Sequence, residues 1–206
     1  ILIHGFIASA QTNWVMPGVF NALAADYHVI ALDNRGHGQS GKPHDPAAYG
    51  PQMAKDVVNL MDHLGIGKAH VAGYSLGGFI TTHLIAKYPN RLLSAAPCGA
   101  GWVAPGDARA GEADLIAEAL ESGNGITPLI EALTPAGQPK PTKEQMEPMN
   151  RMVLAMNDPL ALAAVARGIK HLAVTADELK ASGVAVHSII GEIDPLKESV
   201  DAMHAV

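Results

Sequence analysis

A serine stands between glycines in the segment Gly73-Tyr74-Ser75-Leu76-Gly77-Gly78. A serine hydroxyl can attack an acyl carbon when it is exposed at a sharp turn and a neighbouring base accepts its proton. In a chain with 21 glycines, this spacing alone is weak evidence. The alternative interpretation is a glycine-rich turn that carries an ordinary serine.

The residues on either side favour the first interpretation. The apolar run Ala69–Ala72 predicts a strand before the serine, and the pattern Phe79–Tyr88 predicts a helix after it. A strand-to-helix turn strains the serine and tolerates no bulky flanking side chains, so Gly73 and Gly77 would supply the room. The positive end of the helix would lie where an anion forms. We therefore expect the hydroxyl of Ser75 to point away from the sheet.

Short apolar runs alternate with amphipathic stretches in the rest of the chain, which is typical of a parallel sheet covered by helices. The sequence therefore predicts an α/β fold. One covering helix is predicted from Pro51 to Leu64, because its apolar residues share one face. Apart from Ala69–Ala72, the candidate strands are Ile1–Ile3, His28–Leu32, Leu92–Ala96 and Val184–Ile190.

This alternation stops after the fourth strand. Residues 105–183 show helical patterns with no strand between them, which predicts a helical cap inserted into a core made of residues 1–104 and 184–206. Thr142 with Gln145, and Thr175 with Glu178, have the spacing of capping boxes and predict two helix starts.

Composition excludes several classes of partner. Fourteen basic residues against twenty acidic ones give a net charge of −6 with no basic block, so we expect no nucleic-acid binding. Cys98 is the single cysteine, and no Cys/His spacing suggests a metal site. No apolar run reaches the roughly twenty residues that cross a bilayer. Oligomeric state stays open, and so does the compartment, with the cytoplasm favoured.

Four segments carry a resemblance to a known family. They are His4-Gly5-Phe6, Asp33-Asn34-Arg35-Gly36-His37-Gly38-Gln39-Ser40, Gly73 to Gly78, and Gly191-Glu192-Ile193-Asp194-Pro195. With them the sequence resembles the α/β-hydrolase superfamily, in the branch of small esterases, non-haem haloperoxidases and carbon–carbon bond hydrolases. The resemblance implies the α/β-hydrolase fold with a helical cap. It also implies a serine hydrolase that needs no cofactor or metal and acts on a small acyl compound such as a carboxylic ester.

The resemblance also implies roles for single residues. Ser75 would form the acyl-enzyme, and Asp194 would be the acid that orients a catalytic histidine. The backbone N–H groups of Phe6 and Leu76 would form the oxyanion hole. His4 would be structural, holding its loop by hydrogen bonds. Asp194 has an alternative interpretation, in which it only caps the helix that begins at Pro195.

The expected histidine is the point at which this sequence departs from the family. The family's histidine follows one more helix and strand, yet only twelve residues follow Asp194. His204 alone comes after Asp194, and it falls in a predicted helix, Leu196–Ala205, where its geometry would be wrong. The chain also begins inside a predicted strand without an initiator Met. We therefore expect a fragment truncated at both ends, with the histidine beyond Val206.

A fragment without its histidine should hydrolyse substrate feebly or not at all, while the full-length protein is active. Robust hydrolysis by residues 1–206 that His204→Ala abolishes would contradict this prediction. The same residues could also serve perhydrolysis, lactone opening or carbon–carbon cleavage. A non-catalytic ligand-binding module is the alternative from another class. No motif in the cap indicates the natural substrate or the acyl and alcohol preference.

Overall fold

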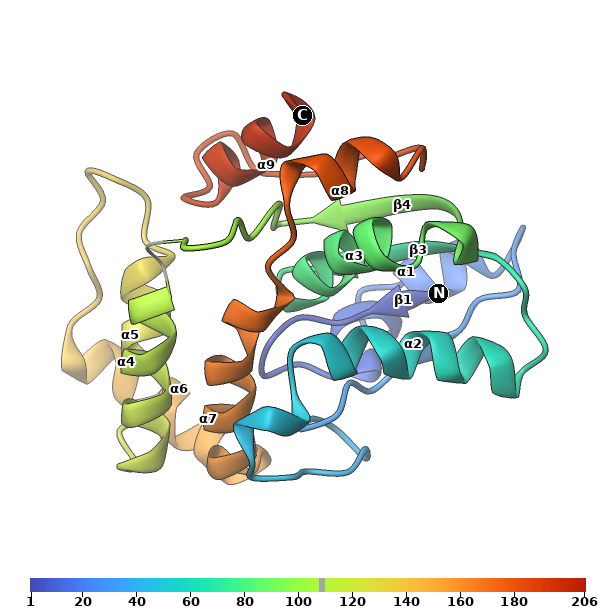
Figure 1. The fold of residues 1–206 in the computed structure, drawn as a ribbon. Coiled ribbons are helices and arrows are strands. Elements are labelled where there is room, and N and C mark those ends of the chain that lie inside the picture. The colour runs from blue at the N-terminus through green and yellow to red at the C-terminus, as the bar shows by residue number, and fades with distance from the viewer. Residues whose placement is uncertain (108–109) are drawn as a thin grey trace.

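A computed structural model describes residues 1–107 and 110–206 of the chain. Its centre is a parallel sheet in the order β2-β1-β3-β4 (Figure 1). The strands are β1 Leu2–Ile3, β2 Ala31–Leu32, β3 Ala69–Tyr74 and β4 Leu92–Cys98. The predicted fifth strand runs parallel to β4 but pairs irregularly, through bridges at Val186 and Ile189. The predicted α/β class and parallel sheet are confirmed.

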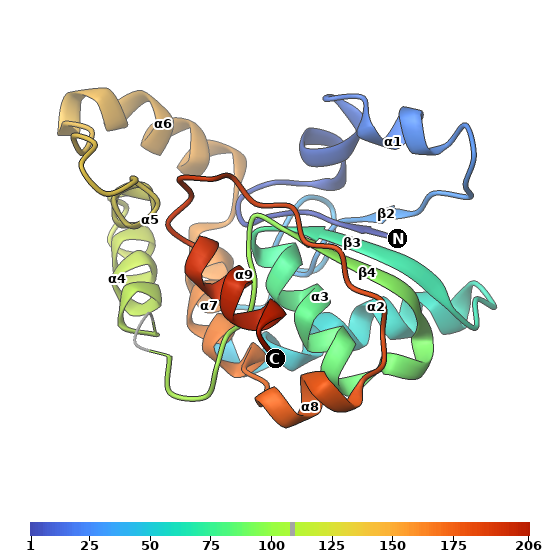
Figure 2. The ribbon, with the colours of Figure 1, turned by 90° about the horizontal axis from the view of Figure 1, so that it is seen from above.

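Helices cover both faces of the sheet (Figure 2). Helix α1 (Val19–Leu23) lies on one face, and α2 (Pro51–His63) and α3 (Leu76–Lys87) lie on the other. Helix α2 begins at Pro51 as predicted and buries its apolar face. Helix α3 begins at Leu76, three residues before the predicted start, so it follows Ser75 directly.

The remaining helical elements complete the core. Helices α8 (Ala176–Ala181) and α9 (Lys197–His204) lie on the same face of the sheet as α3. Short 3-10 or π turns are η1 Gln11–Val15, η2 Pro46–Ala48, η3 Pro89–Arg91 and η4 Ile169–Leu172. Helix α3 is buried along almost its whole length because the sheet covers one side and α8 and η4 cover another.

Four helices stand beside the sheet, at the left of Figure 1, and we call them the cap. They are α4 Ala110–Glu121, α5 Thr127–Ala132, α6 Lys143–Met156 and α7 Pro159–Gly168. Both predicted capping boxes are present, at the starts of α6 and α8. Between residues 105 and 183, the described part of the chain contains no strand. The boundaries at 105 and 183 stay a prediction.

Two buried apolar clusters hold the molecule together. The main cluster joins the sheet to α2, α3 and α7. The second, which we call the cap cluster, is Ile116, Ala117, Leu120, Ile126, Val153, Leu162, Ala163 and Ala166. Phe6 packs against both clusters and Ile7 packs against the cap cluster, so the loop after β1 connects the two.

The two stems of the cap lie side by side. The N–H of Val174, where the chain leaves the cap, donates to the carbonyl of Val103, where the chain enters it, at 3.1 Å. The indole N–H of Trp102 donates to the carbonyl of Val174 at 2.7 Å. The chain therefore enters and leaves the cap at one place.

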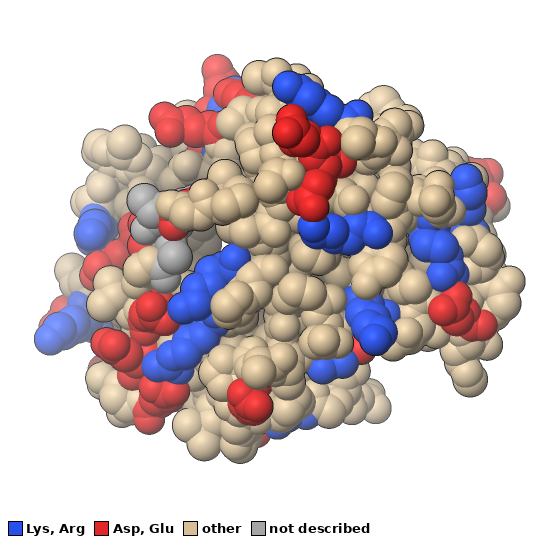
Figure 3. Space-filling model, in the orientation of Figure 1, with Lys and Arg blue, Asp and Glu red and all other residues tan. Residues whose placement is uncertain are grey.

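Charged side chains contribute less to this arrangement. Acidic and basic groups are intermixed over the face in Figure 3. Arg167 donates to Glu121 at 2.9 Å and joins α7 to α4, but both side chains are partly exposed. Such pairs contribute about 1 kcal/mol or less, so apolar packing dominates the cap.

Among the described residues, no single helix is long and apolar enough to cross a membrane. The bent pair formed by α6 with α7 and η4 has the length and composition for a span, by those two criteria alone.

Candidate active site

Ser75 forms the turn between β3 and α3. Its backbone has φ 53° and ψ −114°, a conformation that residues with a side chain rarely adopt. The Ser75 N–H donates to the carbonyl of Cys98 at 2.8 Å, and its own carbonyl accepts from the N–H of Gly78 at 2.7 Å. The strained conformation is therefore fixed on both sides. Strain of this kind concentrates at functional sites.

The glycines beside Ser75 are required by close backbone contacts. A Cβ on Gly73 would lie 2.0 Å from the carbonyl oxygen of Gly77, and one on Gly77 would lie 2.1 Å from that of Ile3. Both obstacles are backbone atoms within the sheet and α3, so they cannot move aside. The geometry accounts for glycine at both positions.

A cavity of about 510 Å³ opens beside Ser75. Phe6, Leu76 and Phe79 form its wall on the core side, and the cap helices form the opposite wall. The other lining residues are Val103, Ala104, Gly106, Asp107, Glu112, Ala113, Ile116, Leu129, Ala132, Leu133, Ala166, Ile169, Lys170, His171, Pro195 and Leu196. Most of these side chains are apolar, so the cavity suits an apolar group.

Two residues that line this cavity have backbone N–H groups without a partner among the described residues. Neither the N–H of Phe6 nor that of Leu76 donates a hydrogen bond to any residue that the structure describes. Both residues line the same cavity as Ser75. Buried N–H groups are almost always paired, so two free ones beside one serine point to an acceptor supplied from outside the protein.

Asp194 lies between the fifth strand segment and α9, and it is half-buried. Its Oδ1 accepts from the N–H of Leu196 at 2.8 Å and so closes a short turn before α9, which begins at Lys197. The following residues, Pro195 and Leu196, line the cavity. Asp194 thus lies next to the cavity, with one carboxylate oxygen engaged in a local turn.

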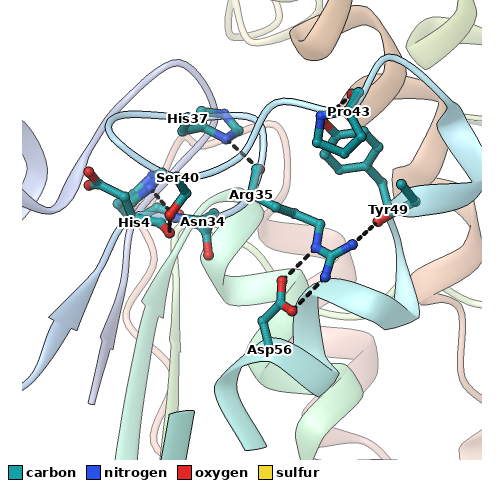
Figure 4. Close-up of polar contacts among 10 residues, drawn as sticks. His4, Asn34, Arg35, His37, Ser40, Pro43, Tyr49 and Asp56 are labelled. Carbon is teal, nitrogen blue, oxygen red and sulfur yellow. Dashed lines mark hydrogen bonds and ion pairs between the residues drawn. The ribbon is translucent and has the colours of Figure 1, made fainter. Parts of the chain in front are cut away.

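His4 is buried and both of its ring nitrogens are engaged (Figure 4). Its Nδ1 donates to the carbonyl of Gly5 at 2.7 Å, and its Nε2 accepts from the N–H of Asn34 at 2.9 Å. Burial lowers the pKa of His4, which keeps the ring neutral. The expected structural role of His4, holding its loop by hydrogen bonds, is confirmed.

His37 lies edge-on to His4, with ring centroids 5.1 Å apart. Burial lowers its pKa to about 3, and its Nε2 has no partner among the described residues. Next to it, Arg35 donates to Asp56 through Nε at 2.5 Å and Nη2 at 2.6 Å, which ties the loop to α2 (Figure 4). The loop 33–40 therefore supports the site and does not enter the cavity.

Sequence reasoning did not anticipate His171. Among the described residues it is the one histidine that lines the cavity of Ser75, and its side chain is exposed on η4. His204 is exposed on α9 and lies outside the lining. No hydrogen bond joins the Ser75 hydroxyl to a side chain in residues 1–107 or 110–206. The pattern of neighbouring residues gave no signal for His171, because no motif surrounds it.

Residues 1–118 match a known family, described as alpha/beta hydrolase fold. The chain belongs to this family. The fold is therefore that of an alpha/beta hydrolase, and the family resemblance of the sequence is confirmed.

Similar proteins include several enzymes. Over 96 residues this chain is 41% identical to a dihydrolipoyllysine-residue acetyltransferase component of the acetoin cleaving system from Pseudomonas putida, and the match covers 46% of this chain and 24% of that protein. Over 92 residues it is 35% identical to esterase YbfF from Escherichia coli, covering 45% of this chain and 34% of that protein. The chain thus spans about a quarter to a third of the length of these curated relatives.

Solved structures match over almost the whole chain. A thermophilic esterase from Thermogutta terrifontis is 27% identical with a TM-score of 0.72, and the match covers 98% of this chain and 75% of that chain. A 2-hydroxy-6-oxo-6-phenylhexa-2,4-dienoate hydrolase from a Rhodococcus species is also 27% identical, with a TM-score of 0.69 and coverage of 98% and 76%. Both matches include the cap helices, since each covers 98% of this chain.

Proposed function

We propose that this chain forms the main part of a serine hydrolase that cleaves esters of apolar carboxylic acids. One observation carries the proposal. The strained Ser75 stands beside two unpaired backbone N–H groups at the edge of an apolar cavity. The names of similar proteins, which include an esterase and putative carbamate hydrolases, support the same class of reaction.

The proposed reaction runs through an acyl-enzyme. The Oγ of Ser75 attacks the ester carbonyl carbon and loses its proton to a base. The carbonyl oxygen becomes an oxyanion and accepts from the N–H groups of Leu76 and Phe6, each worth roughly 3 kcal/mol in comparable sites. The intermediate then expels the alcohol, which takes the proton back from the base. Water attacks the acyl-enzyme by the same route and releases the acid.

The base in this proposal is a histidine outside residues 1–206, oriented by Asp194. Two observations support this view. The Ser75 hydroxyl has no side-chain partner in the described chain, and His171 is an exposed side chain on η4. Residues 1–206 alone should therefore hydrolyse esters slowly, because an unassisted serine hydroxyl is a poor nucleophile at neutral pH.

The lining of the cavity supports an acyl group of small to medium size. A cavity of about 510 Å³ lies within the range of small-molecule sites, and leucine, isoleucine and alanine side chains form most of the cap side. Burial of each methylene of the acyl chain there should stabilise the complex by about 0.8 kcal/mol. Carbon–carbon cleavage and perhydrolysis use the same residues and stay alternatives.

The test uses the complete natural protein that contains these residues. A fluorophosphonate probe should label Ser75, and p-nitrophenyl butyrate should be hydrolysed. Ser75→Ala should abolish labelling and lower kcat at least about a thousandfold. The control is Ser122→Ala, at an exposed serine that follows α4, which should change neither. His171→Asn should retain most of the activity.

Two outcomes would contradict the proposal. Failure of the probe to label Ser75, with tight binding of small apolar acids retained, would favour a ligand-binding module. Loss of hydrolysis in His171→Asn as complete as in Ser75→Ala would make His171 the base, and the external histidine would be wrong.

A further inference from the structure

Ile7 has an unusual backbone. Its φ is 55°, and Ser75 is the only other non-glycine with a positive φ in the described chain. The N–H of Ala8 donates to the carbonyl of Gly5 at 3.4 Å, so Ile7 is the third residue of a four-residue turn. Turns with a positive φ at this position usually place glycine or asparagine there. A β-branched residue in this conformation is an outlier that needs an explanation.

Hydrogen bonds fix this loop on both sides of Ile7 but not at Ile7 itself. On one side, the N–H of Gly5 donates to Asn13 Oδ1 at 2.9 Å. On the other, the N–H of Ala10 donates to Asp33 Oδ1 at 2.8 Å. Between these anchors, the N–H of Phe6 has no partner among the residues described. The N–H of Phe6 shares a planar peptide group with the carbonyl of Gly5, which accepts from His4 Nδ1 at 2.7 Å and from the N–H of Ala8. Polar contacts therefore hold the Gly5–Phe6 peptide on its carbonyl side, whereas the next peptide, between Phe6 and Ile7, makes no hydrogen bond to the described residues.

Apolar packing fills the gap between the two anchors. The side chains of Phe6 and Ile7 both pack against the cap cluster, and Phe6 reaches the main cluster as well. Ile7 is half-buried and does not line the cavity. Its side chain instead joins the turn to the cap.

We propose that Ile7 is a positioning residue, through which the cap holds the Phe6 N–H toward the oxyanion of the reaction. The proposal rests on the function proposed above. The hydrogen bonds to the Gly5 carbonyl hold the Phe6 amide from one side, and contact of Ile7 with the cap cluster keeps the positive-φ turn in place on the other. The cap then contributes to the catalytic rate as well as to substrate binding.

The test compares three variants in the complete natural protein. Ile7→Gly keeps a residue that adopts positive φ readily but removes the contact with the cap. It should lower kcat about tenfold or more, with little change in KM, because a misplaced donor weakens only the transition state. Ile7→Val preserves a branched side chain and should restore most of kcat. Leu162→Ala, inside the cap cluster but outside the lining, should lower kcat in the same selective way.

Two further measurements separate positioning from a general loss of stability. Inhibition by phenylboronic acid, whose tetrahedral serine adduct has an oxygen in the oxyanion position, should weaken in parallel with kcat. Val58→Ala, at a buried position on α2, should lower the unfolding midpoint but leave the kcat of the folded protein unchanged.

Unchanged kcat and boronate inhibition in folded Ile7→Gly would overturn the proposal. An equal fall in kcat for Val58→Ala would do the same. If Ser75→Ala still hydrolyses the ester, the proposed function itself fails, and that result is distinct from either of these.

Discussion

The two walls of the cavity are built in different ways. On the core side, glycines allow backbone atoms to approach closely. Buried hydrogen bonds between His4 and Asn34, and a half-buried Arg35 that donates to the Ala48 carbonyl, fix the loops. On the cap side, alanine and leucine helices pack through an apolar cluster, with partly exposed ion pairs at the rim. The core side therefore tolerates few changes, whereas the cap side can be repacked.

Residues that line the two walls of the cavity serve different purposes. The core wall carries the serine and the two free amides that an oxyanion requires, although the proposal above has the Phe6 amide supported from the cap through Ile7. The cap wall presents methyl and isobutyl groups, which discriminate among substrates mainly by size. Substitutions on the two sides should therefore differ in the size of their effect and in the property that they change.

The largest expected difference comes from replacing one helical glycine on each side with alanine. Gly77→Ala in α3 should destabilise the protein by about 4 kcal/mol or more, because its Cβ would meet the Ile3 carbonyl oxygen at 2.1 Å. A Cβ added at Gly111 in α4 would have no neighbouring atom within 4 Å, so Gly111→Ala should stabilise the protein by roughly 0.5–1 kcal/mol. Urea unfolding measures the free energy of unfolding of both variants. Equal changes in the two would contradict the proposed difference between the core side and the cap side.

The second expected difference concerns pH. The pKa of buried His37 is lowered to about 3, so below pH 6.5 the unfolded state binds a proton that the folded state excludes. The free energy of unfolding should therefore fall as pH drops from about 6.5 toward 3, by up to about 1.4 kcal/mol per pH unit for this group.

Urea titrations at several pH values test this expectation. His37→Asn should reduce the slope of the free energy of unfolding against pH. The cap-side control His171→Asn, at an exposed position, should leave the slope as it is. A slope that is the same in all three proteins would show that His37 is not its source.

The smallest expected effect is a change in chain-length preference. Ala132 lines the cavity from α5, so Ala132→Leu should fill part of it. The ratio of kcat/KM for p-nitrophenyl octanoate to that for the acetate should fall about tenfold, which corresponds to about 1.4 kcal/mol. Ala155→Leu on the exposed side of α6 is the matched control and should keep the ratio. Equal ratios in all three proteins would mean that this wall does not contact the acyl group.

Much of the core could be predicted from the sequence because its signals are local. Apolar runs located the strands, and Thr142 and Thr175 with their partners three residues later marked two helix starts. The glycine pattern around Ser75 located the strained turn because the turn excludes side chains at defined positions. The irregular pairing near Val186 was not foreseen, since apolar runs carry no information on ladder regularity.

The cap wall and Ile7 had no comparable signal. Helices rich in alanine and leucine do not reveal which face turns to the cavity, so the positions of Leu129 and Ala132 in the lining depend on tertiary packing. Isoleucine favours extended backbone, so its presence at residue 7 argued against the turn that the structure contains. Packing against the cap overrides that local preference.

The paired stems at Val103 and Val174 also have an evolutionary consequence. The chain enters and leaves the cap at neighbouring, hydrogen-bonded positions. The segment between them can therefore be exchanged as a single insertion without a change in the order of the strands. Recombination at these two points could join a different cap to the same core with its reactive serine. New substrate ranges would then arise by replacement of one module, while the serine turn is inherited unchanged.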